Sequence, residues 1–461
     1  MSAIKFDKRF FFVFFLTVVT AITAAAVSPQ DVVASFLRSS GVNPGSVAVK
    51  ITDLSDGKTI GRHNNDRPLV PASIMKSVTT AALLRTTGPD YRYRTNVYTD
   101  GPVKMGILKG NLIIEGVCDP ALNSMVEPYG TDILQEIVAE LKTAGINKIE
   151  GALIVDEEQF AGPPRPASWA PGDFSQSYGT GSHALNFENN STGRRSVENP
   201  KGIFLSRLKS ALTKAGIILD GKDLGEGERS ILFTHMSPGI DDIMRSCMMR
   251  SDNLFAECML RTYGKLNGGD GSTADAAEKE AAMWKKKGMP LDGVNIIDGS
   301  GLSRSNRVTA DFMTSVLKDM ADNEVYASFF PLAGQEGTLK SFLAGTPLDS
   351  YIAMKTGSMK GIQCYAGYLL DENYAPTHTV VIIMNDITGS RDRAKKAAQE
   401  MLLGIFADKV NQQENPAEEQ EAAGVDEQEG EETIDPVTEE TEVEIEETEI
   451  EVEESNTKEF I

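Results

Sequence analysis

The sequence predicts an α+β fold in which helices flank an antiparallel sheet and a large segment interrupts the chain. Two extended runs surround Ser55-Asp56-Gly57, and three more occur late, in "SYIAMKTGS", "IQCYAGYLL" and "HTVVIIMND". The early hairpin and the late three-strand meander could share one sheet. Between them the sequence pattern changes to mixed short strands and helices. We therefore predict a discontinuous domain at residues 27–89 and 236–407, with an inserted domain or domains at 90–235.

The chain begins with a predicted export signal at residues 1–26. Lys5, Lys8 and Arg9 precede the apolar run "FFFVFFLTVVTAIT", which ends in small residues. This run is too short for a comfortable membrane span, and no cysteine lies near the cleavage site. We therefore expect a cleaved, exported protein in the periplasm, without a stable membrane span, and an uncleaved anchor is the alternative.

The elements that follow are read from their periodicity. "PQDVVASFLRSSG" and the segment after Ser73 predict helices, and the inserted section mixes the strands "RYRTNVYTDG", "LKGNLIIEG" and "KIEGALIVD" with the helix "TDILQEIVAELKTAG". From about residue 238, the Met- and Leu-rich stretch predicts packed core helices. "SRDRAKKAAQEMLLGIFAD" predicts a closing helix.

An acidic tail dominates the net charge of −22. Residues 411–461 hold 21 Asp or Glu against one Lys, while the leader is slightly basic, so the body is close to balanced at about −4. Nothing therefore marks a nucleic-acid binder. We predict that residues 408–461 are a solvated, disordered tail, with cation or partner binding as the alternative.

Metal and disulfide frameworks are not indicated. The cysteines at 118, 247, 258 and 364 form no CxxC pair, and the histidines at 63, 183, 235 and 378 form no HExxH cluster. We expect no metal and no other cofactor.

A Ser-x-x-Lys pair at Ser73 and Lys76 is the first candidate for chemistry. The pattern occurs six times, but only Ser73 follows a Pro-Ala step at a helix start and precedes an apolar, small-residue helix. Residues three apart on a helix share one face, and a helix N-terminus favours a developing negative charge. By itself the pair fits either catalysis or a helix cap.

Two further triplets favour catalysis. Ser251-Asp252-Asn253 lies in a helix-flanked segment, and Lys355-Thr356-Gly357 ends a predicted strand. S-x-x-K, S-D-N and K-T-G in this order form the signature of penicillin-binding proteins and related β-lactamases. In this arrangement Ser73 attacks a carbonyl and a neutral Lys76 takes its proton, helped by burial and by the second cation, Lys355.

The remaining motif residues have expected roles in the same reaction. Ser251 relays a proton to the leaving amine, and Asn253 holds the substrate amide. Lys355 and Thr356 meet the terminal carboxylate of the substrate, and Gly357 lets the backbone pass close to the ligand. The backbone N–H groups of Ser73 and Ser358 are the expected oxyanion hole.

With these motifs, the chain resembles the class C low-molecular-mass penicillin-binding proteins, the D-alanyl-D-alanine carboxypeptidase/endopeptidase family. The 178-residue spacing from Ser73 to Ser251 matches the large insertion known in that family. The segments "GNLIIEGVCDPAL", "IIDGSGLSRSNRVT", "FPLAGQEGTL" and "AMKTGSMKGIQCYAGYL" are similar to family segments. The resemblance covers residues 28–407. It implies a DD-peptidase-like transpeptidase domain with no cofactor, acting on peptidoglycan stem peptides and binding β-lactam antibiotics.

The resemblance also implies an outer binding site. Asp173, Tyr178 and Arg304 fall where the family binds the diamino-acid side chain of the stem peptide, although ordinary surface or packing roles are the alternative. Lys360 stands where some members have a polar amide. Asp298 and Ser300 are expected to be structural, since DGSG is also an ordinary turn sequence.

Three functions are compatible with this motif set. A serine DD-peptidase is favoured over a β-lactamase or esterase, because the insert is long and no Glu-x-x-Leu-Asn stretch is present to activate a deacylating water. A non-catalytic cell-wall scaffold would be expected to have a broken motif set, and this one is complete. Carboxypeptidase and endopeptidase action share the same chemistry and stay open.

Overall fold

The computed structural model describes residues 27–124 and 132–414, with side chains described as far as residue 411. The predicted leader and most of the predicted tail lie outside these residues. No helix in the described ranges is long and apolar enough to cross a membrane.

A five-stranded antiparallel sheet is the centre of the first structural region. The strand order is β13-β14-β15-β1-β2, and Val47 of β1 pairs with Met384 of β15. The N-terminal hairpin and the C-terminal meander therefore share one sheet, as predicted. The strand bounds are β1 (Val47–Asp53), β2 (Thr59–His63), β13 (Ile352–Met359), β14 (Ile362–Leu370) and β15 (Pro376–Met384).

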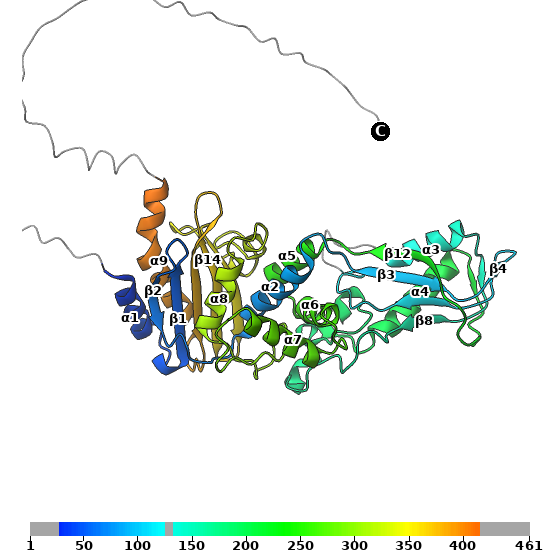
Figure 1. Cartoon of the computed structure of the whole chain (residues 1–461), viewed down its shortest axis with the longest axis horizontal. Helices are drawn as coiled ribbons and strands as arrows, with labels where there is room; N and C mark the ends of the chain where they lie inside the picture. Colours follow the sequence, from blue (N-terminus) through cyan, green and yellow to red (C-terminus); the bar gives the residue numbers. More distant parts are fainter. Residues whose placement is uncertain (1–26, 125–131, 415–461) are drawn as a thin grey trace, which may run out of the picture. The chain divides into compact units, whose positions relative to one another are not determined.

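Helices cover both faces of this sheet (Figure 1). On one face, α1 (Pro29–Ser39) and α9 (Arg391–Glu414) pack on alternate strand residues such as Val49 and Ile382. On the other face, Ala48 and Val381 belong to the larger core, which includes residues of five helices. These are α2 (Met75–Thr87), α5 (Ile240–Arg250), α6 (Asn253–Leu266), α7 (Thr273–Lys286) and α8 (Ala310–Met320).

Helix α2 is buried on all sides along most of its length, since residues 75–84 are all buried. Such a helix must be apolar or small throughout, and its few polar groups need partners. A short 3-10 helix, η2 (Ala72–Ile74), precedes it and contains Ser73. Ser73 therefore lies in a tight turn before the α-helix, rather than in the first α-helical turn.

The segment between β3 and β12 forms sheets of its own. Two four-stranded sheets have the orders β12-β3-β6-β8 and β11-β7-β5-β4, and a two-stranded sheet pairs β9 (Ser191–Thr192) with β10 (Arg195–Ser196). The core cluster that includes Ile137 and Phe204 packs α3 (Ile133–Thr143) and α4 (Pro200–Lys214) with the four-stranded sheets. The strands are β3 (Arg94–Thr99), β4 (Val103–Lys104), β5 (Ile107–Leu108), β6 (Leu112–Glu115), β7 (Lys148–Ile149), β8 (Leu153–Asp156), β11 (Ile218–Leu219) and β12 (Ser230–Met236). We propose that residues 90–235 are the inserted unit.

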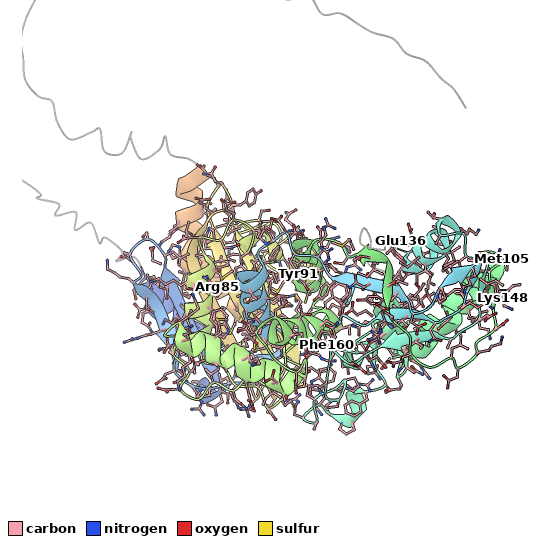
Figure 2. All side chains as sticks on the ribbon, turned by 45° about the vertical axis from the view of Figure 1, so that its right-hand side comes forward. Arg85, Tyr91, Met105, Glu136, Lys148 and Phe160 are labelled. Atoms are coloured by element: carbon pink, nitrogen blue, oxygen red, sulfur yellow. The ribbon has the colours of Figure 1, made fainter. Side chains whose placement is uncertain are left out.

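The chain passes into and out of this segment at adjacent points. Ser237 N donates to Tyr93 O at 3.1 Å, and Ile240 N donates to Tyr91 O at 2.8 Å; Figure 2 labels Tyr91 at this crossing. Two neighbouring connections explain how a long segment can interrupt the other domain without disrupting it.

Two predicted elements differ in the structure. "KIEGALIVD" is not one strand, because β7 and β8 join different sheets; the chain turns at Gly151, where a Cβ would lie 2.3 Å from Gly110 O. The closing helix α9 continues to Glu414, so residues 408–414, predicted as tail, are helical. The tail was predicted to begin at residue 408 because acidic residues dominate the sequence that follows. Helix α9 extends past this predicted boundary.

Candidate active site

Ser73 and Lys76 are in contact at the start of the buried helix. Lys76 Nζ lies 3.1 Å from Ser73 Oγ and also donates to Asn253 Oδ1 at 2.6 Å and to Ser300 O at 2.7 Å. The Lys76 side chain is fully buried. Three oxygen contacts thus hold the amine at the nucleophile, in the geometry of a base.

Burial also sets the charge of this amine. Desolvation holds the pKa of Lys76 below its ordinary value, against the opposing effect of nearby acidic groups such as Glu257. Lys355 is buried as well, and desolvation together with the charge of Lys76 holds its pKa well below the ordinary value. A low lysine pKa favours the neutral form that can accept the Ser73 proton.

The Ser251-Asp252-Asn253 turn connects α5 to α6. Ser251 has a left-handed backbone with φ of 59°, which ends α5, and the Asp252 carboxylate caps α6 by accepting from Phe255 N. The turn directs Ser251 Oγ to within 2.9 Å of Lys355 Nζ. Asn253 accepts from Lys76 and donates from Nδ2 to Tyr178 O at 2.7 Å.

Strand β13 closes the site from the other side. At Gly357 a Cβ would lie 2.7 Å from Pro71 O and 3.1 Å from Ser73 N, so the strand backbone passes directly beside the nucleophile turn. Thr356 Oγ1 bonds Thr338 Oγ1 at 2.8 Å. Gly357 therefore allows β13 to pack closely against the Ser73 turn, and its expected role in letting the backbone pass close to the ligand stays a prediction.

Arg391 is a cation that the sequence analysis missed. Its NH1 donates to Ser358 Oγ at 2.8 Å from the beginning of α9. Ser358 is next to the K-T-G triplet, so Arg391 adds a positive charge at the edge of the site. Its only sequence signal is a basic residue at the start of the closing helix.

The DGSG loop, residues 298–301, contacts Lys76 through the carbonyl oxygen of Ser300. The buried Asp298 accepts from Trp169 Nε1 at 2.8 Å and from Gly301 N at 2.9 Å, which orders the loop that presents Ser300 O to Lys76. Glu257, also missed from sequence, accepts from Ser300 N at 2.8 Å. Asp298 and Ser300 therefore have contacts suited to the structural role predicted for them.

The outer residues line the same cavity as the nucleophile. Asp173, Tyr178, Arg304 and Lys360 surround a cleft of about 490 Å³ with Ser73, Ser251, Asn253 and Ser358. Tyr178 OH donates to Asp173 Oδ1 at 2.9 Å, and Arg304 NH2 donates to Lys360 O at 2.9 Å. The fold thus places the predicted outer site beside Ser73 and Ser251, whose contacts Lys76 and Lys355 are both fully buried.

Across the described ranges, no group of three or more His, Cys, Asp or Glu side chains is arranged to hold a metal ion. The chemistry available from these residues is acyl transfer to a serine, with lysines and hydroxyl groups moving protons.

Comparison with known proteins identifies the family. The profile of the D-Ala-D-Ala carboxypeptidase 3 (S13) family matches residues 30–194 and 188–405. The chain belongs to this family. S13-family membership confirms the resemblance and the enzyme class predicted from sequence, a serine-type D-alanyl-D-alanine carboxypeptidase/endopeptidase.

Curated relatives agree with the S13 assignment. The D-alanyl-D-alanine carboxypeptidase DacB of Haemophilus influenzae is 24% identical over 437 residues, covering 78% of this chain and 88% of the relative. A D-alanyl-D-alanine carboxypeptidase from Actinomadura sp. is 23% identical over 410 residues, covering 70% and 74%.

The fold is shared with penicillin binding protein 4 from Haemophilus influenzae, at a TM-score of 0.68, 23% identity and coverage of 80% of this chain and 98% of that one. A predatory endopeptidase from Bdellovibrio bacteriovorus has a TM-score of 0.52 at 19% identity, covering 80% and 94%. These structures confirm the predicted fold class.

Proposed function

We propose that this S13-family chain hydrolyses D-Ala-D-Ala bonds, and the related cross-link bonds, of peptidoglycan stem peptides through an acyl-enzyme on Ser73. The observation that carries the proposal is the buried Lys76 amine, 3.1 Å from Ser73 Oγ and held by Asn253 and Ser300. A helix cap would not need a buried lysine with three oxygen contacts, so this geometry favours catalysis over capping.

In the acylation step, neutral Lys76 accepts the Ser73 hydroxyl proton as Oγ forms a bond to the D-alanyl carbonyl carbon. The oxygen of that carbonyl becomes an oxyanion, and its stabilisation is assigned to the backbone N–H groups of Ser73, in η2, and Ser358, in β13. Gly357 permits this approach, since any side chain there would meet the Ser73 turn.

The intermediate then collapses and the carbon–nitrogen bond breaks. Its electron pair stays on the leaving amine, which receives a proton through Ser251, the hydroxyl that contacts Lys355 at 2.9 Å. A water molecule next attacks the Ser73 ester, releasing the shortened peptide and restoring the serine proton. The two half-reactions together add one water across one peptide bond.

Recognition is assigned to two sides of the cleft. The terminal carboxylate of a D-Ala leaving group meets Thr356, Lys355 and the Arg391–Ser358 pair. Asp173, Tyr178, Arg304 and Lys360 take the diamino-acid side chain of the stem peptide, where the Asp173–Tyr178 bond offers an acceptor for an ammonium group.

Two further proposals follow from the chemistry and the leader. β-Lactams would acylate Ser73; among the structural neighbours, the Haemophilus protein is known with a β-lactam bound and a Bdellovibrio endopeptidase is known acylated by penicillin G. The leader pattern supports action in the periplasm, where peptidoglycan is accessible.

The test is to incubate the mature protein, beside a Ser73→Ala control, with monomeric pentapeptide and cross-linked dimer muropeptides, and to identify products by mass. Loss of one alanine or splitting of dimers by the unmodified protein alone supports the peptidase. Unchanged muropeptides across several pH values would instead favour the scaffold or the β-lactamase.

A further inference from the structure

Two buried cysteines meet where the inserted segment contacts α6. Cys118 follows strand β6, and Cys258 lies in the second turn of α6. Both side chains are fully buried, and with Leu254 they form one small cluster against Phe160, which Figure 2 labels. Their thiol groups share a hydrogen bond, so the two sulfur atoms are neighbours in the folded protein.

Polar neighbours favour a thiolate at one of the two sulfurs. Asn186 Nδ2 donates to Cys258 Sγ at 3.3 Å, and the Asn186 side chain also bonds Cys118. Burial raises the pKa of Cys118, but the hydrogen bonds from Cys258 and Asn186 and the charge of Arg261 outweigh it and hold this pKa below its ordinary value. Burial and the bond to Cys118 hold the pKa of Cys258 well above its ordinary value. The shared proton therefore belongs to Cys258, and Cys118 is the nucleophile of the pair.

The backbone around Cys118 holds its sulfur in this place. Cys118 has a left-handed backbone, with φ of 60°, which costs energy for a residue with a side chain. Its N–H donates to Ala184 O at 2.6 Å, and Asn186 Nδ2 also donates to Asp119 O at 3.3 Å. Asn186 thus ties the Cys118 loop to the Cys258 thiol, so the two sulfurs are kept together without a covalent bond.

The other two cysteines have different partners. Cys247 Sγ donates to Asp252 O at 3.3 Å, and Cys364 Sγ donates to Val70 O at 3.7 Å. Both belong to the larger core rather than to the cluster at α6. The fold therefore pairs two of the four thiols and gives the other two backbone partners.

We propose that Cys118 and Cys258 form a disulfide bridge in the exported protein, which fixes the inserted segment to the helix that begins with Asn253. The bridge is independent of the proposed peptidase activity and rests on the proposed periplasmic location. Thiols that touch in a chain delivered to an oxidising compartment are expected to be oxidised. The spacing of the cysteines gives no sign of the pair, because most of the inserted segment separates them in the chain.

The oxidation requires a disulfide donor, a protein or small-molecule disulfide of that compartment. The Cys118 thiolate attacks one sulfur of the donor, and the electron pair of the broken bond leaves on the other donor sulfur. Cys258 then gives up its proton and attacks the Cys118 sulfur, which releases the second donor thiol. The protein loses two electrons and two protons, and the donor disulfide becomes two thiols. Because both sulfurs are fully buried in the folded protein, this exchange takes place during folding, before the inserted segment closes over α6.

The experiment isolates the full mature chain from the periplasm of a bacterial host that expresses it with its own leader, after free thiols are blocked with N-ethylmaleimide. Trypsin places each cysteine in a separate peptide, with Cys118 in residues 110–142 and Cys258 in residues 251–261. Mass spectrometry is expected to find these two peptides joined without reductant and separate after reduction. The peptides of Cys247 and Cys364 should carry the maleimide.

Thermal unfolding measures what the bridge contributes. A phosphine reductant should lower the melting temperature of the unmodified protein by about 5 °C or more, because the bridge restricts the unfolded chain across a long loop. Cys118→Ala and Cys258→Ala should lack this response. Cys364→Ala removes a buried thiol outside the pair, so it is the matched control and should keep both the joined peptides and the response.

Four maleimide-labelled cysteines in the periplasmic protein would overturn the inference, as would a bridge between a different pair of cysteines. Recovery of the chain only from the cytoplasm would overturn it as well, by removing the location on which it rests. The joined peptides are detected in the unmodified protein, so a variant that fails to fold does not affect this result. Muropeptide cleavage is not measured here, so a failure of the proposed peptidase activity is distinguishable from a failure of the bridge.

Discussion

Lys76 illustrates at the residue scale how burial creates a base. An ordinary lysine, with a pKa of about 10.4, is charged at neutral pH and cannot accept the Ser73 proton. The fold buries Lys76, which lowers its pKa, and surrounds Nζ with oxygen atoms that fix its position. The proton therefore has an acceptor in place before substrate arrives.

Acylation of Ser73 by a fluorescent penicillin should increase as the pH rises through an ionisation below the ordinary lysine value. Lys76→Arg should slow acylation about a hundredfold to ten-thousandfold, because a guanidinium stays protonated. The control is Lys209→Arg, which alters an exposed Ser-x-x-Lys pair on α4. A flat pH profile between about pH 6 and 9 would argue against Lys76 as the base.

Glu280 on α7 is a second buried ionisable group, outside the cleft. Neither carboxyl oxygen has a well-formed hydrogen bond among the described residues, and burial raises the pKa of Glu280 from 4.5 to about 8, with Trp284 and Glu257 as its polar neighbours. Between these values the unfolded chain releases a proton that the folded protein keeps. The free energy of unfolding therefore falls as pH rises from about 5 to 8, by about 1.4 kcal/mol per unit.

Glu280→Gln cannot ionise and should escape this loss. We expect the melting temperature of the variant, relative to the unmodified protein, to rise steadily between pH 5 and pH 8, as measured by thermal unfolding at matched ionic strength. Glu278→Gln, a change at an exposed position of the same helix, is the control and should show no such trend. A constant difference at all pH values would contradict the raised pKa.

At the scale of elements, the reactive geometry depends on how closely β13 packs against η2. The absent side chain at Gly357 lets the strand pass the Pro71 and Ser73 backbone, and a Cβ there would lie within 2.7 Å of Pro71 O. Neighbouring β14 holds β13 in register, with Lys355 opposite Ala366. The proposed oxyanion donors, in η2 and β13, thus depend on this contact between the two elements.

Gly357→Ala should reduce penicillin acylation about tenfold or more, because displacing β13 misplaces a donor by a fraction of an ångström. Gly389→Ala is a suitable comparison, since no atom lies within 4 Å of a Cβ there. Stopped-flow acylation measures the effect, and circular dichroism checks that the sheet persists. Acylation at the normal rate would show that the close approach is not needed.

At the scale of the whole molecule, Arg261 of α6 connects that helix to the inserted segment. Its guanidinium, which is almost fully buried, donates from Nε to Gly271 O at 2.7 Å, from NH2 to Ala161 O at 3.1 Å and from NH1 to Ser182 O. It also lies 5.4 Å from the ring centroid of Phe160, which Figure 2 labels. The same inserted segment carries Tyr178, whose carbonyl holds Asn253.

Arg261→Met should lower the free energy of unfolding by about 3 kcal/mol, because buried carbonyl groups lose their donors. It should also slow acylation, through the loosened Tyr178–Asn253 contact. Urea unfolding gives the first quantity, with Arg62→Met as an exposed control. A loss below about 0.5 kcal/mol would mean that the inserted segment is held by other contacts.

Much of the fold was predictable because its signals are local. Alternating apolar residues predicted the hairpin and the meander, and the helical period predicted α1 and α3. The split of "KIEGALIVD" between two sheets was not, because it depends on how Gly151 meets the distant Gly110 backbone. The end of α9 at Glu414 was also missed, because the acidic segment that follows led to a predicted tail that begins at residue 408.

The sequence by itself determined the reactive set, because S-x-x-K, S-D-N and K-T-G each place reactive atoms through a few consecutive residues. Only the tertiary structure decided what surrounds that set. Arg391 at Ser358, Glu257 at Ser300 and Cys118 at Cys258 are contacts between residues far apart in the chain. Burial and charge pairing arise when such segments pack together, and no local pattern in the chain records which segments will meet.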